Sequence, residues 1–457
     1  MFKSSRREFL VGCSSAIAAM AGSHMNRVVF GSPDDEPNQN IMVVIFLRGG
    51  CDALSVIAPM GGEDRAHYEA AREFLKIPAT GHNQLLQLGN SNFGLHPRAT
   101  HLHDLFADNK LALIPATGMA SSPTRSHFDA MQYMELGTPG SKSTSSGWLT
   151  RHLQTSNNDW QSDIMPVMGI GSISPTSLSG THNKVVMDNT DEFKLNVGFP
   201  SQQAGQLNTL RSLYSQKNSI VHNAGKNGLN AAEIVELNDS SSYQPENGAK
   251  YPNGSFGDQL KLIAQMVKLQ LGLRIATVDL GGWDTHDYQS TKNPVAGYFP
   301  DRLGMLSQGM KAFYDDLNGS APADDYSKRV TVVCMSEFGR RLEENENYGT
   351  DHGHGGFMML MGGEVKGGLH GTWPGLHPDQ LYDNIDLAVT TDYRQVLSEI
   401  LIRRFENNNL GTIFPDYTGY APLDLVLGHD IDPNYEQLAL QVPESNEQKI
   451  FIPYAAN

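Results

Sequence analysis

The feature that most constrains the fold is an apolar, β-branched run that stops abruptly at Glu337. Residues 329–335 read Arg-Val-Thr-Val-Val-Cys-Met, which is typical of a strand buried on both faces. Similar runs occupy 41–47 and 274–280, and a polar loop containing glycine follows each of them. The sequence therefore predicts an α/β fold with a mostly parallel central sheet flanked by helices.

Further elements are expected around these three strands. Additional strands are predicted at 111–118 and 357–361, and helices at 102–109, 128–136, 256–271, 303–317 and 391–401. Residues 155–254 are rich in Gly, Ser and Asn with weak periodicity, which indicates an irregular insertion rather than a second domain. We expect one α/β domain at 41–422, followed by a surface tail at 423–457.

The N-terminus is typical of an export signal. Ser5-Arg-Arg-Glu-Phe-Leu10 is a twin-arginine motif, and a short, weakly apolar segment follows it. We predict a twin-arginine signal peptide at 1–30, a polar linker at 31–40, the twin-arginine translocase as a partner, and a periplasmic or secreted location. No later stretch approaches the roughly 20 apolar residues of a membrane span, so no stable membrane anchor is expected.

The charge balance restricts the partners of the protein. Its formal net charge of −16 argues against nucleic acid, because binding to a phosphate backbone depends on a surplus of Lys and Arg. An anionic substrate would need local help from a metal ion or from clustered arginines. Removal of the predicted signal peptide, which contains Cys13, leaves Cys51 and Cys334; they lie at strand-like positions and are too few for a disulfide framework.

Carboxylates and imidazoles gather where the predicted strands end. Asp351, His352 and His354 fall within four residues of a glycine-rich loop, and Asp284 and His286 are two apart, so that both can project to one side of an extended loop. The carboxyl ends of parallel strands share one edge of a sheet, where ligands bind. The predicted metal ligands are Asp52, Asp284, His286, Glu337, Asp351, His352 and His354.

This mixed ligand set indicates a divalent metal. Zinc or manganese fits it first, iron is compatible, and calcium or magnesium would suit an oxygen-rich half of the site. The structural alternative is a set of turns in which Asp caps a loop and His lies on the surface.

A second group of candidate residues opens the helix predicted at 128–136. Ser126 or Thr124 can act as an N-cap, or can use the free N–H groups of the helix start to stabilise an anion or a nucleophile. Arg125 can hold two oxygens of a phosphate or sulfate in a fork. We take Ser126, Arg125 and His127 as catalytic candidates, with Thr124 or a metal-activated water as alternative nucleophiles.

Seven motifs in order resemble the signatures of the family called domain of unknown function 1501. They are Phe46-Leu-Arg-Gly-Gly-Cys-Asp-Ala-Leu54, Thr124-Arg-Ser-His-Phe-Asp-Ala130, Gly147-Trp-Leu-Thr-Arg151, Gly281-Gly-Trp-Asp-Thr-His286, Met335-Ser-Glu-Phe-Gly-Arg-Arg341, Gly349-Thr-Asp-His-Gly-His-Gly355 and Thr390-Thr-Asp-Tyr-Arg394. The resemblance spans about 41–415. It implies twin-arginine export and an alkaline phosphatase-like fold, in which two metal ions and a nucleophile at a helix start act on phosphate or sulfate esters.

The resemblance also assigns roles to individual positions. Asp52 resembles the ligand after the first strand, and Asp284 with His286 resembles the later Asp and His pair. Ser126 lies where the nucleophile segment falls, and His352 or His354 takes the place of the last metal histidine. The chain departs from the superfamily pattern at Glu337-Phe338, where Asp-His or Asp-Asn is usual, and at Thr124, where the serine form of the sulfatase motif has Ser.

The sequence therefore favours an exported metal-dependent hydrolase of phosphate or sulfate esters, acting on an anionic ester or on an envelope or extracellular polymer. The alternative is a non-catalytic exported binding or assembly protein that retains the fold and a structural metal. A redox enzyme with non-haem iron is a third option, although no dinucleotide fingerprint accompanies it.

Overall fold

The computed structural model describes residues 39–156, 165–181, 184–187, 203–217, 243–319 and 325–440, with scattered residues between 157 and 233. The predicted signal peptide, nearly all of the linker, parts of the insertion, and 441–457 of the expected tail lie outside the described residues. No helix within the described ranges is both long and apolar enough to cross a membrane.

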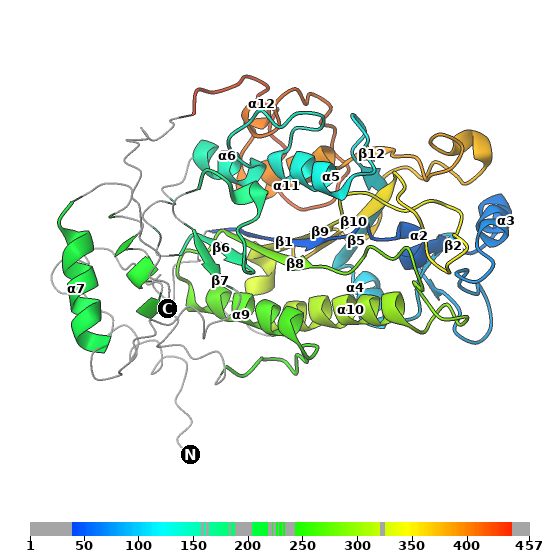
Figure 1. The fold of residues 1–457 in the computed structure, drawn as a ribbon, viewed down its shortest axis with the longest axis horizontal. Coiled ribbons are helices and arrows are strands. Elements are labelled where there is room, and N and C mark those ends of the chain that lie inside the picture. The colour runs from blue at the N-terminus through cyan, green and yellow to red at the C-terminus, as the bar shows by residue number, and fades with distance from the viewer. Residues whose placement is uncertain are drawn as a thin grey trace, which may run out of the picture.

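A nine-stranded sheet forms the centre of the molecule (Figure 1). Its order is β11-β5-β10-β9-β1-β8-β6-β7, with β12 pairing with β5. The strands are β1 (Ile41–Leu47), β5 (Leu111–Gly118), β6 (Val167–Ile170), β7 (Val185–Met187), β8 (Ile275–Leu280), β9 (Val330–Met335), β10 (Gly356–Met361), β11 (Gly368–Leu369) and β12 (Thr391–Asp392).

The sheet is mixed, which corrects the expectation of a mostly parallel sheet. β1 lies parallel to β8 and β9, with Ile45 opposite Val278 and Cys334, whereas β10 is antiparallel to both β5 and β9. Residues 336–355 join β9 to β10 without a helix. Because this loop leaves and re-enters at the same edge of the sheet, β10 has to run back beside β9.

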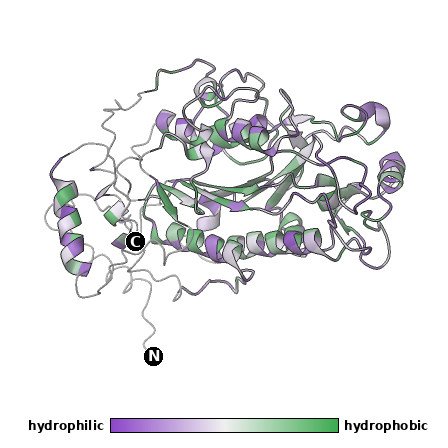
Figure 2. Ribbon diagram, in the orientation of Figure 1, coloured by the Kyte–Doolittle hydropathy of each residue, from purple (hydrophilic) through white to green (hydrophobic). Residues whose placement is uncertain are grey.

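Helices cover both faces of the sheet (Figure 1). One layer contains α4 (Thr100–Ala107), α9 (Ser255–Leu269) and α10 (Tyr298–Leu317), and the other contains α5 (His127–Leu136), α6 (Trp148–Thr155), α11 (Tyr393–Phe405) and α12 (Leu410–Ile413). Figure 2 shows hydrophobic strands between helices of mixed character. The observed fold is thus α/β, as predicted.

The packing of β1 explains why its sequence is continuously apolar. Val43 and Ile45 belong to the core that includes α9 and α10, whereas Met42 and Val44 belong to the core that includes α11. All seven residues of β1 are buried. Alternate side chains therefore fill different cores, and neither face tolerates a polar residue.

Smaller elements surround this centre. They are α2 (Ala53–Val56), α3 (Gly62–Ala71), α7 (Gln203–Ser215), the 3-10 helices η3 (Thr176–Leu178), η6 (Tyr326–Arg329) and η7 (Pro378–Gln380), and a second sheet of β2 (Ile57–Pro59), β4 (Phe93–Leu95) and β3 (Leu86–Gln87).

Two predicted boundaries change. Part of the expected irregular insertion supplies β6 and β7 to the central sheet, and strands this short leave little periodicity in a sequence. The expected surface tail packs onto the domain where it begins, because Leu425 and Val426 are buried. The Glu399 carboxylate accepts hydrogen bonds of 2.6 Å from the backbone N–H groups of Leu423 and Leu425.

Candidate metal centre

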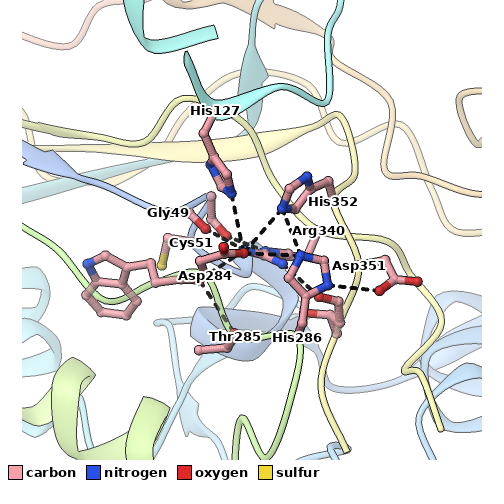
Figure 3. Close-up of polar contacts among 12 residues, drawn as sticks. Gly49, Cys51, His127, Asp284, Thr285, His286, Arg340, Asp351 and His352 are labelled. Atoms are coloured by element: carbon pink, nitrogen blue, oxygen red, sulfur yellow. Dashed lines mark hydrogen bonds and ion pairs between the residues drawn. The ribbon is translucent and has the colours of Figure 1, made fainter. Parts of the chain in front are cut away.

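A cluster of three imidazoles and one carboxylate lies beyond the carboxyl ends of β8 and β9 (Figure 3). Asp284 and His286 belong to the loop after β8, and His352 belongs to the loop between β9 and β10. His127 is the first residue of α5. Three segments that are remote in sequence therefore converge at one edge of the sheet, as predicted for Asp284, His286 and His352.

Three of the distances within the cluster match the spacing of ligand atoms around a small cation. Asp284 Oδ1 lies 3.3 Å from His127 Nε2 and 3.2 Å from the Nε2 atoms of both His286 and His352. The Nε2 atoms of His286 and His352 are 2.8 Å apart. A tetrahedral zinc ion with bonds of about 2.0–2.1 Å would place its ligand atoms about 3.3 Å apart.

The Nδ1 atom of each ring faces an oxygen that can only accept a hydrogen bond. The pairs are His127 Nδ1 with Glu337 Oε1 at 2.7 Å, His286 Nδ1 with Asp351 Oδ1 at 3.0 Å, and His352 Nδ1 with the Arg125 carbonyl at 2.7 Å. Each Nδ1 therefore carries the proton, and in a neutral ring the lone pair lies on Nε2. Histidines that ligate metals usually show this second hydrogen bond.

Four acceptor atoms thus point toward one another. His127 Nε2 is buried without a hydrogen-bond partner, and in neutral rings the Nε2 lone pairs of His286 and His352, 2.8 Å apart, would repel each other. The Arg340 guanidinium donates to Asp284 Oδ1 at 2.6 Å but compensates only that oxygen. A bound cation, or extra protons on the rings, would relieve this repulsion.

The electrostatics keep the carboxylate charged. Burial alone would raise the pKa of Asp284, but the hydrogen bond and charge of Arg340, with smaller effects from His352 and His127, hold that pKa well below its usual range. The hydrogen bond to Glu337 raises the pKa of His127. Burial and the charge of Arg340 lower the pKa of His352, which favours its neutral form.

The groups behind the cluster are rigidly held. Glu337 is fully buried and also accepts from the Gly49 N–H at 2.8 Å and the Ser336 hydroxyl at 3.0 Å. Arg340 donates to the carbonyls of Gly50 and Thr350, each at 2.7 Å. Gly49 has φ +123°, and a Cβ there would collide with the backbone of the loop that carries Asp284.

Asp52 does not join the cluster, contrary to its prediction as a ligand. Its carboxylate accepts from Arg72 at 2.6 and 3.0 Å, from Ser55 at 2.6 Å and from Gln289 at 2.7 Å. The aspartate and arginine side chains are buried. With both oxygens in use, Asp52 stabilises the loop after β1 rather than holding an ion.

Three other predicted ligands occupy different places. Glu337 and Asp351 lie behind His127 and His286 and accept their Nδ1 protons. The His354 ring packs against Tyr382 with centroids 4.3 Å apart, and burial lowers its pKa to about 4.

The structure places the catalytic candidates at the start of α5. Ser126 is the N-cap, with its hydroxyl accepting from the Asp129 N–H at 3.4 Å. Arg125 donates to Asp386 Oδ2 at 2.5 Å, while its carbonyl orients His352. His127, expected to be catalytic, contributes its Nε2 to the cluster. Thr124 Oγ1 accepts from the Ser126 N–H at 3.2 Å.

Sequence reasoning missed the role of Arg340. The arginine was visible in the segment after β9, yet nothing in the pattern distinguishes it from Arg341 beside it. Only the fold shows that Arg340 is buried and reaches Asp284. The arginine partner of Asp52 also has no sequence signal, because Arg72 follows twenty positions later, at the end of α3.

Comparisons with known proteins give one extensive match. The profile of the family described as "Protein of unknown function (DUF1501)" matches residues 39–409. A probable receptor-like protein kinase of Arabidopsis thaliana is 27% identical over 140 residues, which cover 31% of this chain and 16% of that protein. Because the match covers so little of the kinase, the activity of the kinase says nothing about this chain.

Among the solved structures that align with the chain, one is a complex with an oligosaccharide. It is described as Ps i-CgsB in complex with k-i-k-neocarrahexaose, and it is 11% identical, covering 72% of this chain and 68% of that chain. Its TM-score of 0.31 is too low to carry an argument about the fold or the function.

Proposed function

The chain belongs to the DUF1501 family, and we propose that it is a metal-dependent hydrolase of phosphate or sulfate esters. The observation that carries this proposal is the convergence of three Nε2 atoms on the Asp284 carboxylate. Each lone pair is set by an acceptor behind its ring, so the rings are oriented before any ion binds. Such preorganisation is typical of metal sites.

The residues favour particular ions. Three imidazoles and one carboxylate suit zinc or manganese better than calcium or magnesium, which prefer oxygen ligands. A bound divalent ion would supply a water of lowered pKa and would neutralise charge on an ester oxygen. Because the chain has a net charge of −16, an anionic ester depends on such local positive charge.

The chain's own residues would position the substrate. Asp386 anchors the guanidinium of Arg125, whose side chain is 40% exposed and can turn its remaining N–H groups to an ester oxyanion. Ser126, Thr124 and a water are the alternative nucleophiles. Of these, Ser126 is adjacent to His127 at the start of α5, where free N–H groups favour negative charge.

The first experiment is metal analysis of the mature protein purified after native export. We expect about one zinc or manganese ion per chain, and a loss of that ion in Asp284→Asn. Near-zero metal, with no uptake of added zinc, manganese or calcium, would exclude the metal centre.

The second experiment measures turnover of an aryl phosphate and an aryl sulfate by the metal-loaded protein. If Ser126 is the nucleophile, Ser126→Ala abolishes turnover while the metal content stays unchanged. Equal rates in the wild type and the variant would assign the attack to Thr124 or to water.

A non-catalytic binding or assembly protein is the second candidate function. It is favoured by the positions of Asp52 and Glu337, which bond to Arg72 and His127 and so leave the ligands of a second ion incomplete. Full occupancy by a single ion without turnover across phosphate and sulfate esters would support this candidate. Two ions per chain would contradict it.

The twin-arginine motif supports export to the periplasm or the exterior as part of the proposal. The motif belongs to residues outside the described ranges, so its support comes from the sequence alone.

A further inference from the structure

Three exposed aromatic side chains lie next to the metal centre in the chain or in space. Phe128 is 83% exposed, Tyr288 71% and Tyr298 50%. Within the described ranges, no other aromatic residue occurs among the large hydrophobic side chains that are exposed. Exposed aromatic rings close to a polar site can serve as stacking platforms for a ligand.

Each ring is tied to a different part of the cluster. Phe128 directly follows His127 in α5, and Tyr288 comes two residues after His286. The Tyr298 hydroxyl lies against Gly282, where a Cβ would collide with it, two residues before Asp284. Because α5 and α10 cover opposite faces of the sheet (Figure 1), a ligand that touches Phe128 and Tyr298 would cross the edge where the cluster lies.

Two of the rings are held in place. The Tyr288 N–H donates to the Asn347 carbonyl at 2.9 Å, and its ring stacks on Tyr348 with centroids 6.0 Å apart. The Arg302 guanidinium lies 5.5 Å from the centroid of the Tyr298 ring and donates to its hydroxyl at 3.1 Å. Rings that are already ordered lose little entropy when a ligand stacks on them.

Arg302 adds a cation to these rings. Its side-chain contacts are the Tyr298 hydroxyl and the Met305 sulfur, at 3.9 Å, and no carboxylate of the described residues pairs with it. A guanidinium without a carboxylate partner favours an anionic ligand, and its fork matches the oxygens of a sulfate or phosphate.

We propose that Phe128, Tyr288, Tyr298 and Arg302 form an aromatic rim that binds an anionic polysaccharide and leads it to the metal centre. This inference rests on the proposed hydrolase function and specifies its substrate class. A sugar ring presents a flat C–H face to an aromatic ring and hydroxyls to tyrosine, while its sulfate or phosphate groups meet Arg302. Nucleic acid also stacks on aromatic rings, but it carries a phosphate at every nucleotide and its binding depends on several Lys and Arg contacts, whereas this rim supplies one guanidinium.

The test measures binding of dextran sulfate and chondroitin sulfate by calorimetry, with neutral dextran for comparison. The protein is used as purified and again after removal of metal by a chelator. We expect Tyr288→Ala and Tyr298→Ala each to weaken binding by about 2- to 10-fold. Arg302→Gln should reduce the preference for sulfated over neutral dextran. Leu438→Ala, an exposed apolar residue of the C-terminal segment, is the matched control and should leave binding unchanged.

Several results would overturn the proposal. These are the absence of binding to both sulfated polymers, equal binding by the wild type and the three rim variants, and binding to phosphatidylglycerol vesicles or single-stranded DNA in place of the sulfated polymers. The two proposals fail separately. A protein that holds metal but binds no polymer would refute the aromatic rim and leave the metal centre standing. A protein that binds polymer but takes up no metal would leave the rim standing and refute the hydrolase.

Discussion

Replacing Glu337 by Gln tests whether the carboxylate behind His127 prepares that ring for a metal ion. Glu337 is fully buried, and its oxygens accept from His127, Gly49 and Ser336. A glutamine can keep all three contacts, because its carbonyl oxygen can replace Oε1 and its NH2 group can donate to the Ser336 hydroxyl oxygen. Glu337→Gln therefore removes the negative charge and little else.

The expected magnitude follows from these contacts. Losing a carboxylate behind a metal-binding histidine weakens metal affinity by about 10- to 100-fold, or about 1.4–2.7 kcal/mol. The unfolding free energy should fall by only about 1–2 kcal/mol, since the hydrogen bonds remain but lose their charge. Glu337→Ala would instead leave buried donors on Gly49 and His127 unpaired, at about 1–3 kcal/mol each, and is a poorer test.

The assay is competition for zinc against a chromophoric chelator, combined with urea unfolding of the same samples. Glu399→Gln is the matched control, because Glu399 is equally buried and accepts backbone N–H groups far from the cluster in sequence. The control should lose at least as much unfolding free energy, because its NH2 group would face a backbone N–H, and should keep the wild-type zinc affinity. If Glu337→Gln binds zinc as tightly as the wild type, the assignment of His127 as a ligand oriented by Glu337 is wrong.

Further predictions concern stability and export. Asp52→Asn should cost about 3–5 kcal/mol by leaving Arg72 buried without its anion. Burial alone would raise the pKa of Asp52, but Arg72 holds that pKa below its usual value. The stability from this ion pair is therefore complete above about pH 4 and is lost at lower pH. Circular dichroism against pH should show a different acid transition for the wild type and Asp52→Asn, and the same transition in both would show that the pairing is wrong. Glu399→Ala should speed amide exchange at 423–426. Unchanged rates there would contradict the role of the Glu399 carboxylate in holding this segment. Replacing Arg6 and Arg7 by Lys should retain the precursor in the cytoplasm on fractionation, and normal export would refute the signal.

The local sequence predicted the elements at the centre of the fold well. The expected strands at 41–47 and 111–118 coincide with β1 and β5, and α5, α9 and α10 appear close to the expected helices. These segments are buried on one or two faces, so their periodicity records their surroundings. The direction of β10 was not predictable in the same way, because it depends on the path of the loop after β9.

His286, His352 and Asp284 were recognisable because they stand out in glycine-rich loops after apolar strands. The partners of Asp52 and Glu337 could not be recognised from the sequence. A carboxylate at a strand end looks the same in a sequence whether it faces an ion, an arginine or the Nδ1 atom of a histidine. Their partners Arg72 and His127 come from α3 and α5, and only packing brings them near.

By itself, the sequence determined the class of the fold and which loops carry the reactive side chains, because burial and turn chemistry are local properties of the chain. The tertiary structure decided which of those side chains meet, which serve as supports, and which ring nitrogen each support leaves free. Those outcomes depend on distances of about 3 Å between segments hundreds of residues apart, and no local pattern encodes them.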